Sequence, residues 1–413
     1  MIHVIEEAQR CLQCRKPLCM TGCPISTGIP QMIKLLKENR VHEAGKMLFE
    51  NNPLSVVCSL VCDHQKQCEG HCVLGRKGQS VHISSIENYI SETCLDTVEI
   101  DKEPDNGDMI AVIGAGPAGI TIAIEMRKRG YDVTIFDSRD KIGGVMRYGI
   151  PEFRLPKSLL DRYKSRLRAL GIQIRPNTTI GGALVINDLL RDGYKAIFIG
   201  TGVWRPKKLS VPGETLGNVH FAIDFLVNPQ AYDVGRRVAI IGAGNTAMDV
   251  ARTILRFPGH HEVTIYARRS ASDASYDELE YARLEGAQFE YCVRPLRIEK
   301  DGPVFVRTIV DEEGQIIGEE EGELKREADT TFIAISQGPK SKLVDTTEGL
   351  KPSRNGLLLT DEKGETTHPG IFAAGDVVLG ARTVVEAVNY AKKVACSMDE
   401  YVRGLRGEKA QTE

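Results

Sequence analysis

The chain has 413 residues, of which 42% are hydrophobic and 26% are charged, as in an ordinary soluble globular protein of about two to four domains. The 53 Lys and Arg against 56 Asp and Glu leave a formal net charge of −3, which argues against nucleic-acid binding led by phosphate neutralisation. The most apolar charge-free stretch, 109–124, has 16 residues and is broken by glycines and a proline, whereas a membrane span needs about 20 apolar residues. The N-terminus also lacks the basic-then-apolar order of a signal peptide. We therefore expect a cytoplasmic protein without a membrane span.

Cysteines crowd the start of the chain. Nine of the eleven lie in the first 94 residues, and only Cys292 and Cys396 follow. In a reducing compartment such a concentration more often indicates metal binding than disulfides. The nine are Cys11, Cys14, Cys19, Cys23, Cys58, Cys62, Cys68, Cys72 and Cys94.

Eight of these thiols form two groups of four, within 11–23 and 58–72, and the first group ends in Cys23-Pro24 as a bacterial ferredoxin run does. Zinc would favour paired Cys-x2-Cys knuckles separated by a loop. The spacing therefore favours two [4Fe–4S] clusters, with zinc as the alternative. Cys94, Cys292 and Cys396 have no partner at a useful spacing, and we expect them to be structural.

The first 105 residues show helical periodicity and little strand signal. Residues 29–49 predict two short amphipathic helices. Residues 95–108 are polar and rich in turn formers, which predicts a linker. The sequence thus predicts a small helical domain over 1–105.

Beyond the linker the pattern changes to alternating strands and helices, and it does so twice. An apolar strand from Met109, a glycine loop and a helix lead to a second strand from Asp132, and the same order recurs between Val238 and the strand from Glu262. Gly114 and Gly242 hold the same place in the two copies, 128 residues apart. This pattern indicates an internal duplication of a βαβ dinucleotide-binding unit.

Each glycine loop has the residue types that a dinucleotide requires. The first Gly makes the tight turn, the second lets backbone approach a pyrophosphate, and the third position lets helix and strand pack closely. The helix N-terminus presents free N–H groups and the positive end of its dipole. The alternative is a Rossmann-like turn without a ligand. The expected contacts are Gly114, Gly116, Pro117, Ala118 and Gly119 in the first copy, and Gly242, Gly244, Asn245 and Thr246 in the second.

The two copies differ where they would contact the adenosine ribose. In the first, Asp137 ends the second strand, and a carboxylate there binds ribose hydroxyls and repels a 2′-phosphate. In the second, the equivalent Ala267 is followed by Arg268 and Arg269, two guanidiniums that can pair with a phosphate. The second copy therefore fits NADP(H), unless the two arginines are only a solvated strand end.

A further strand and a long helix are expected near the end of the chain. Residues 371–376 (Ile-Phe-Ala-Ala-Gly-Asp) predict a buried strand that ends in a turn, and a helix is expected from Thr383 to Met398. The Gly375-Asp376 pair places a carboxylate at the end of that strand.

These motifs together resemble those of the two-dinucleotide-binding flavoproteins. Thr367 to Asp376 resembles that superfamily's T-x4-F-A-x-G-D motif, and Phe198 to Gly202 resembles the strand that closes its FAD domain. The segment GGVMRYGIPEFRLPK (143–157), together with the N-terminal cysteines, is similar to the glutamate synthase small-subunit family. That family also includes the NADPH-binding subunit of bifurcating NADH-dependent ferredoxin:NADP oxidoreductase and the flavin/iron–sulfur half of dihydropyrimidine dehydrogenase.

The resemblance implies an α/β fold in which a small helical iron–sulfur domain precedes two nested Rossmann-like domains. The implied boundaries are 1–105 for the helical domain, 106–230 with 341–413 for a discontinuous FAD-binding domain, and 231–340 for the NAD(P)H-binding domain. FAD would occupy the first glycine loop and NADP(H) the second. The further flavin-binding residues implied are Gly143, Gly144, Arg154, Gly202, Gly375, Asp376 and Thr383.

The resemblance also assigns the thiols to clusters. One cluster would take Cys11, Cys14, Cys19 and Cys72, and the other Cys23, Cys62 and Cys68. The fourth ligand of the second cluster would be Glu87, whose alternative role is a solvated helix carboxylate. Cys58 matches a family cysteine that is not a ligand. The family usually has Cys-Pro where this chain has Cys62-Asp63, which affects the turn rather than the ligand.

The electrons are expected to pass through the N-terminal domain. A thioredoxin-reductase-like exit would need a Cys-x-x-C pair near the flavin, and 143–371 contains only Cys292. The sequence therefore predicts an NADPH-dependent electron-transfer subunit with FAD, two [4Fe–4S] clusters and no catalytic residues beyond these cofactors. Its partner subunit would be glutamate synthase large-subunit-like, ferredoxin-type or dihydropyrimidine dehydrogenase-type. The alternatives are reverse flow, which reduces NADP⁺, and a non-enzymatic, zinc-held interaction module.

Overall fold

The computed structural model describes residues 3–412, with side chains through residue 407. The chain divides into two compact units. Unit 1 comprises Met1–Arg147, Glu152–Val203 and Gly338–Glu413, and unit 2 comprises Tyr148–Pro151 and Trp204–Gln337. Both are α/β, as the sequence predicts.

The N-terminal part of unit 1 is helical, and its description contains no strand before Met109. The two predicted amphipathic helices are α3 and α4. On α3, Ile29, Met32, Ile33 and Leu36 repeat every three or four residues and are buried in a core that Ala44, Leu48 and Ile90 share. The elements are α1 (Val4–Gln9), α2 (Leu18–Thr21), α3 (Ile29–Lys37), α4 (Val41–Asn51), α5 (Ser55–Val61), η1 (Val73–Arg76) and α6 (Ile83–Cys94).

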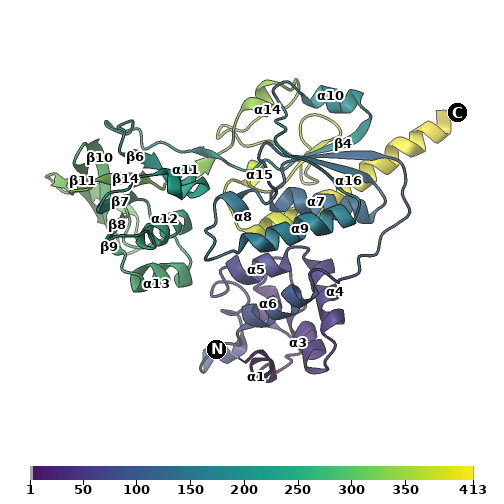
Figure 1. The fold of residues 1–413 in the computed structure, drawn as a ribbon, viewed down its shortest axis with the longest axis horizontal. Coiled ribbons are helices and arrows are strands. Elements are labelled where there is room, and N and C mark those ends of the chain that lie inside the picture. Colours follow the sequence, from purple (N-terminus) through teal and green to yellow (C-terminus); the bar gives the residue numbers. More distant parts are fainter. Residues whose placement is uncertain (1–2, 413) are drawn as a thin grey trace. The chain divides into compact units, whose positions relative to one another are not determined.

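The rest of unit 1 is built on a five-stranded parallel sheet in the order β16-β4-β1-β2-β3. The strands are β1 (Met109–Ile113), β2 (Asp132–Phe136), β3 (Gln173–Arg175), β4 (Tyr194–Ile199) and β16 (Ile371–Ala373). Figure 1 shows α7, α9 and α16 between this sheet and the N-terminal helices. The helices are α7 (Pro117–Lys128), α8 (Val145–Tyr148), α9 (Lys157–Ala169), α10 (Ile186–Arg191), α14 (Lys342–Asp345), α15 (Asp376–Leu379) and α16 (Val384–Thr412).

Unit 2 repeats the arrangement with a second parallel sheet in the order β6-β14-β7-β8-β9. β7, β8, β9 and β14 occupy the places of β1, β2, β3 and β4, which confirms the predicted duplication. The outer strand differs in origin, because β6 precedes its sheet in sequence whereas β16 follows. The elements of this layer are β6 (Val219–Phe221), α11 (Ala222–Val227), η2 (Pro229–Ala231), β7 (Arg237–Ile241), α12 (Asn245–Leu255), β8 (Glu262–Tyr266), α13 (Tyr276–Leu284), β9 (Gln288–Glu290) and β14 (Thr330–Ile333).

An antiparallel sheet that the sequence did not predict is inserted between β9 and β14. β11 pairs with β10, β12 and β13. The chain enters and leaves unit 2 through β5 (Arg205–Pro206) and β15 (Gln337–Gly338), which pair with each other. The inserted strands are β10 (Val293–Glu299), β11 (Gly302–Val310), β12 (Ile316–Glu319) and β13 (Leu324–Lys325).

Two boundaries differ from those expected from the sequence. Unit 2 begins at Trp204 rather than at 231, because β6 pairs with β14 and so belongs to the second sheet. Helix α16 continues to Thr412 instead of ending at Met398. Its extension contains no proline and includes an i,i+4 pair of Asp399 with Arg403 and an ion pair of Arg406 with Asp108.

The N-terminal part of unit 1 is joined to helices α9 and α16 by hydrogen bonds, one of which is buried. The Tyr163 hydroxyl on α9, 1% exposed, donates to the Pro53 carbonyl at 2.7 Å. On α16, the Asn389 amide donates to the Pro24 carbonyl at 3.0 Å, and the Lys392 ammonium donates to the Asn51 carbonyl at 2.7 Å. The helical part is therefore fixed against α9 and α16 within one compact unit.

Candidate functional site

The first glycine loop lies between β1 and α7, where backbone comes too close for side chains. A Cβ on Gly119 would lie 1.9 Å from the Gly114 carbonyl oxygen, so the helix packs directly on the turn. Gly114 has φ +105°, and a Cβ there would meet the Gly200 carbonyl oxygen at 2.5 Å. Gly116, the N-cap of α7, has its nearest neighbour for a Cβ at 3.9 Å. The loop thus has room for a phosphate at Gly116, beside the free N–H groups in the first turn of α7.

Two other predicted glycine segments converge on this loop. The Gly143 N–H donates to the Ala115 carbonyl at 2.8 Å, and a Cβ on Gly144 would lie 2.8 Å from the Gly116 Cα. Gly202 follows β4, whose end abuts the loop through Gly200. Backbone from three segments therefore surrounds the N-terminus of α7, an arrangement that suits a pyrophosphate.

Gly375 and Asp376, which follow β16, also lie beside the first glycine loop. A Cβ on Gly375 would lie 3.3 Å from the Ala118 Cβ, so the end of β16 adjoins the start of α7. Burial raises the pKa of the Asp376 carboxyl to about 7, and its Oδ1 accepts from the Arg382 N–H at 3.2 Å. Thr383 caps α16 through a reciprocal capping box with Glu386. The Thr383 hydroxyl is thus already used locally.

Asp137 lies directly after β2, as the sequence predicts. Its carboxylate accepts from the Ala115 N–H at 2.6 Å and from the Arg139 N–H at 2.7 Å. Burial raises the pKa of this carboxyl, and the two backbone donors offset part of the shift. Each oxygen keeps a further lone pair for a ribose hydroxyl. The carboxylate is therefore held against the loop by two backbone N–H groups.

The second glycine loop has the same construction. Gly242 has φ +115°, and a Cβ there would meet the Ala334 carbonyl oxygen at 2.4 Å, whereas Gly244 has no neighbour within 4 Å of a Cβ. The Asn245 Oδ1 accepts from the Ser275 N–H at 2.8 Å, which leaves its NH₂ group for a ligand. Thr246 lies half-buried in the first turn of α12. Ser272 was not predicted from the sequence. Its hydroxyl donates to the Ala243 carbonyl at 2.6 Å, which holds the loop after β8 against the glycine loop.

Arg268 and Arg269 are exposed just beyond the end of β8. Their backbone is anchored, because the Arg268 carbonyl accepts from the Thr308 hydroxyl at 2.8 Å and the Arg269 carbonyl accepts from the Cys292 N–H at 3.2 Å. Neither guanidinium makes an ion pair or hydrogen bond with another residue in the described part of the chain. Both are therefore available to an anionic ligand at the carboxyl end of the second sheet.

The N-terminal thiols gather in two places. Cys11, Cys14, Cys19 and Cys72 line one pocket, with apolar walls that include Ile29 and Ile33. Burial raises the pKa of the Cys19 thiol to about 11, and the nearby sulfurs of Cys72, Cys11 and Cys14 add to the shift. These are the four thiols that the family resemblance assigns to one cluster.

The second group surrounds Cys68, which is buried. Burial raises the pKa of this thiol, and Glu87, Glu69 and Cys23 contribute further. The pKa of Cys62 is raised by its hydrogen bond with Cys58 and by burial, with Glu87 and Cys68 contributing. Glu87 is buried near Cys62 and Cys68, and burial raises the pKa of its carboxyl to about 8.

The thiols of the two groups are donors of the kind that four-iron clusters require. No group of three or more His, Cys, Asp or Glu in the described residues is arranged to hold one ion. Each thiolate of a four-iron cluster binds a different iron, so its ligands need not converge on one point.

The remaining predicted residues lie elsewhere. Cys58 is 4% exposed beside Cys62, Cys94 is buried against the Val41 carbonyl, and Cys396 is exposed. Arg154 is half-buried in the loop before α9, and its contact with a cofactor stays a prediction. Asn389, which bonds the Pro24 carbonyl next to Cys23, was missed because no sequence periodicity links positions 365 residues apart.

Comparisons with known proteins agree with this arrangement. Residues 108–393 match the pyridine nucleotide-disulphide oxidoreductase family, which also matches over 75–188, and residues 2–98 match the family of dihydropyrimidine dehydrogenase domain II, 4Fe-4S cluster. The chain is 33% identical to the glutamate synthase [NADPH] small chain of Azospirillum brasilense, over 96% of this chain and 89% of that one. It is 31% identical to the NAD-dependent dihydropyrimidine dehydrogenase subunit PreT of Salmonella typhimurium, over 96% and 94%.

A solved structure shares the fold. The FprA protein of Mycobacterium tuberculosis in complex with NADPH matches with a TM-score of 0.63 at 17% identity, over 74% of this chain and 86% of that one. The fold and the paired glycine loops define a two-dinucleotide-binding oxidoreductase that uses a flavin and iron–sulfur. Within that class, the chain belongs to the glutamate synthase small-chain family. No helix in the described residues is both long and apolar enough to cross a bilayer.

Two glycines of the first loop give a matched pair of variants. Gly119→Ala forces a Cβ onto the Gly114 carbonyl and should destabilise the fold by at least about 1–3 kcal/mol. Gly116→Ala has room in the protein and should fold normally, but its methyl group would obstruct a pyrophosphate and lower bound FAD at least about tenfold. Thermal unfolding and flavin absorbance of the purified variants measure the two effects. Full flavin occupancy in Gly116→Ala would contradict the assignment of this loop.

Proposed function

We propose that this protein is an NADPH-dependent electron-transfer subunit that carries FAD and two [4Fe–4S] clusters and delivers single electrons to a partner subunit. When bound, the flavin accepts a hydride from the nicotinamide and releases electrons singly, which is the form that iron–sulfur clusters accept. The chain's own residues hold these groups.

One observation carries the proposal. Helix α16 begins beside the Gly375-Asp376 turn of the proposed flavin cradle and donates from Asn389 to the Pro24 carbonyl, next to Cys23 of the second thiol group. The second thiol group is therefore attached to the same helix as the cradle. We assign this group, Cys23, Cys62, Cys68 and Glu87, to the cluster nearer the flavin, and the Cys11–Cys72 group to the outer one.

The proposal also concerns the nucleotide. The relatives differ in this respect, since the named glutamate synthase chain is an NADPH enzyme and PreT is NAD-dependent. In this chain, the absence of a carboxylate at Ala267 and the two available guanidiniums at Arg268 and Arg269 favour the 2′-phosphate of NADPH.

Replacing both arginines tests that choice. Arg268→Ala with Arg269→Ala should lower kcat/KM for NADPH by about tenfold to a hundredfold, because two charge-assisted contacts are lost, and should change that for NADH little. Arg236→Ala, at the opposite end of β8 where Arg236 pairs with Glu262, serves as the control and should affect neither. An equal loss for both nucleotides would refute the phosphate assignment.

The number of clusters can be counted directly. Protein purified without oxygen should contain about eight iron atoms, and Cys14→Ala and Cys68→Ala should each lose about four, because each removes a ligand from one cluster. Cys396→Ala, an exposed thiol away from both groups, should lose none. Zinc in place of iron would contradict the proposal.

The fourth ligand of the second group is tested with the same measurement. Glu87 and Cys58 both lie beside Cys62, and we assign the ligand to Glu87. Glu87→Ala should then reduce iron occupancy or change the spectrum of that cluster, whereas Cys58→Ala should not. The reverse pattern would transfer the assignment to Cys58.

A further inference from the structure

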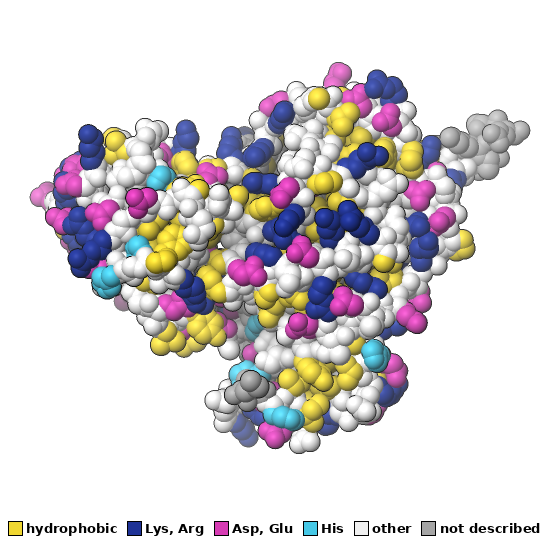
Figure 2. All heavy atoms as spheres, in the orientation of Figure 1, with side chains coloured by type: hydrophobic (Ala, Val, Ile, Leu, Met, Phe, Trp, Pro, Cys, Tyr) yellow, Lys and Arg dark blue, Asp and Glu magenta, His cyan; other side chains and the backbone are white. Residues whose placement is uncertain are grey.

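The loops around the outer thiol group carry an unusual local charge. Residues 10–20 and 72–82, which contain Cys11, Cys14, Cys19 and Cys72, include five Lys and Arg and no Asp or Glu, although the whole chain has a net charge of −3. On the face that Figure 2 shows, side chains of both charges are present. The positive charge is thus concentrated at one thiol group.

The two loops form one surface. The Arg10 guanidinium donates to the Ser80 carbonyl at 3.1 Å and to the Gln79 carbonyl at 2.5 Å, which ties the first loop to the second. Leu18 and Cys72 line both the thiol pocket and an adjoining hollow of about 600 Å³, and Arg76 lines that hollow as well. A partner that fills the hollow would therefore reach the edge of the outer thiol group.

Four of the five cations are not engaged within the protein. Arg15, Lys16, Arg76 and Lys77 are exposed, and in the described part of the chain none forms an ion pair or a side-chain hydrogen bond. Most other charged side chains of the N-terminal helices are paired, for example Arg40 with Glu38 and Glu43. We call these four residues the basic collar. Leu12, 62% exposed, projects from the same loop as an apolar contact.

From this surface we infer that the basic collar is the docking site for the acidic face of an electron-transfer protein, which receives electrons at the Cys11–Cys72 group. The inference rests on the proposed function and adds to it the place and the chemistry of the partner. A group of positive charges around the site of electron transfer increases the rate of encounter with a negatively charged partner and orients that partner.

Cytochromes of opposite charge serve as probes. Each NADPH releases two electrons and one proton, and each ferric haem takes one electron, so two cytochromes are reduced for each NADPH oxidised. Acidic cytochrome b5 and basic cytochrome c are compared as acceptors of the holoenzyme at low and high salt. Binding of immobilised cytochrome b5 to the holoenzyme is measured separately by biolayer interferometry.

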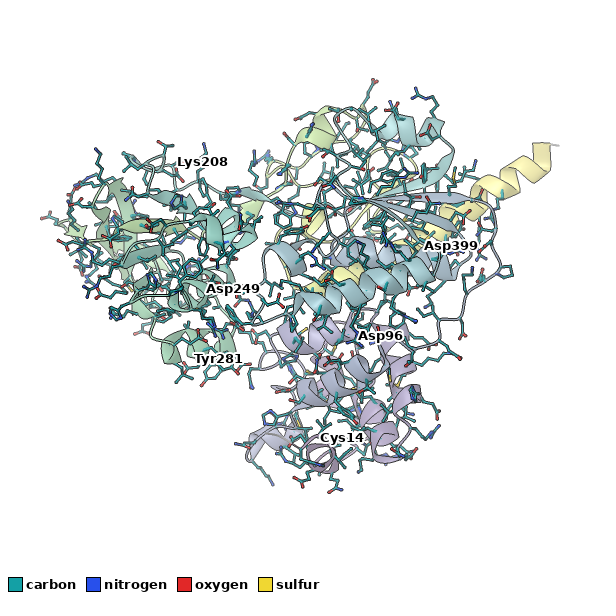
Figure 3. The ribbon with its side chains drawn as sticks, viewed as in Figure 1. Cys14, Asp96, Lys208, Asp249, Tyr281 and Asp399 are labelled. Carbon is teal, nitrogen blue, oxygen red and sulfur yellow. The ribbon has the colours of Figure 1, made fainter. Side chains whose placement is uncertain are left out.

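The charge-reversal variant is Arg76→Glu with Lys77→Glu, and the milder variant is Arg76→Gln with Lys77→Gln. Lys207→Glu with Lys208→Glu, an adjacent exposed pair in unit 2, makes the same change of charge elsewhere (Figure 3). At low salt, reversal at the collar should lower kcat/KM for cytochrome b5 about tenfold and weaken its binding, and should raise kcat/KM for cytochrome c. The milder variant should give a smaller change of the same sign. High salt should remove most of the difference, and the unit 2 variant should show none.

The experiment distinguishes an error in the docking assignment from an error in the proposed function. Equal changes for both cytochromes, with iron content unchanged, would mean that the cations only offset the charge of the cluster, and would overturn the docking assignment. No change with cytochrome b5 would overturn it as well. Failure of NADPH to reduce the clusters of the unsubstituted protein would instead refute the proposed function.

Discussion

Helix α16 is the element on which the rest of unit 1 depends. Its N-terminus is capped by Thr383 beside the Gly375-Asp376 turn. Five and eight residues after its first residue, Val384, Asn389 bonds the Pro24 carbonyl after the first thiol run and Lys392 bonds the Asn51 carbonyl at the end of α4. A buried hydrogen bond from Tyr163 on α9 to the Pro53 carbonyl adds to these contacts. Together they hold the N-terminal helices, which carry the cysteines, against α9 and α16 of the same unit. Electron transfer falls steeply with distance, so a fixed junction is what a relay from flavin to cluster requires.

Both parallel sheets have the same steric constraint at the turn from the first strand to the following helix. In each, a helix starts so close to the preceding strand that glycine is required, at Gly114 and Gly119 in one unit and at Gly242 in the other. The copies then diverge at the end of the second strand, where Asp137 is held by backbone N–H groups and Arg268 and Arg269 extend into solvent. In our proposal, the same fold therefore offers two sites with opposite charge preferences, one for each dinucleotide.

Local patterns in the sequence were sufficient to predict much of this. The glycine loops, the duplication and the amphipathic helices α3 and α4 follow from spacing over a few residues, and the resemblance to a family supplied the pairing of Cys72 with Cys11, Cys14 and Cys19 around one pocket. Contacts between distant segments were not predictable. The bond from Asn389 to the Pro24 carbonyl spans 365 residues, and β6 joins the second sheet only because β14 lies beside it. The part of α16 beyond Met398 includes ion pairs with distant residues, such as Arg406 with Asp108, which no local propensity signals.

The central claim is that electrons pass from a reduced flavin into the N-terminal thiol groups. Anaerobic titration of the purified holoenzyme with NADPH, followed by low-temperature electron paramagnetic resonance, tests it most directly. The account predicts that bleaching of the flavin is accompanied by the signals of reduced iron–sulfur clusters. Complete flavin reduction without any cluster signal, in protein that contains its full iron, would contradict it.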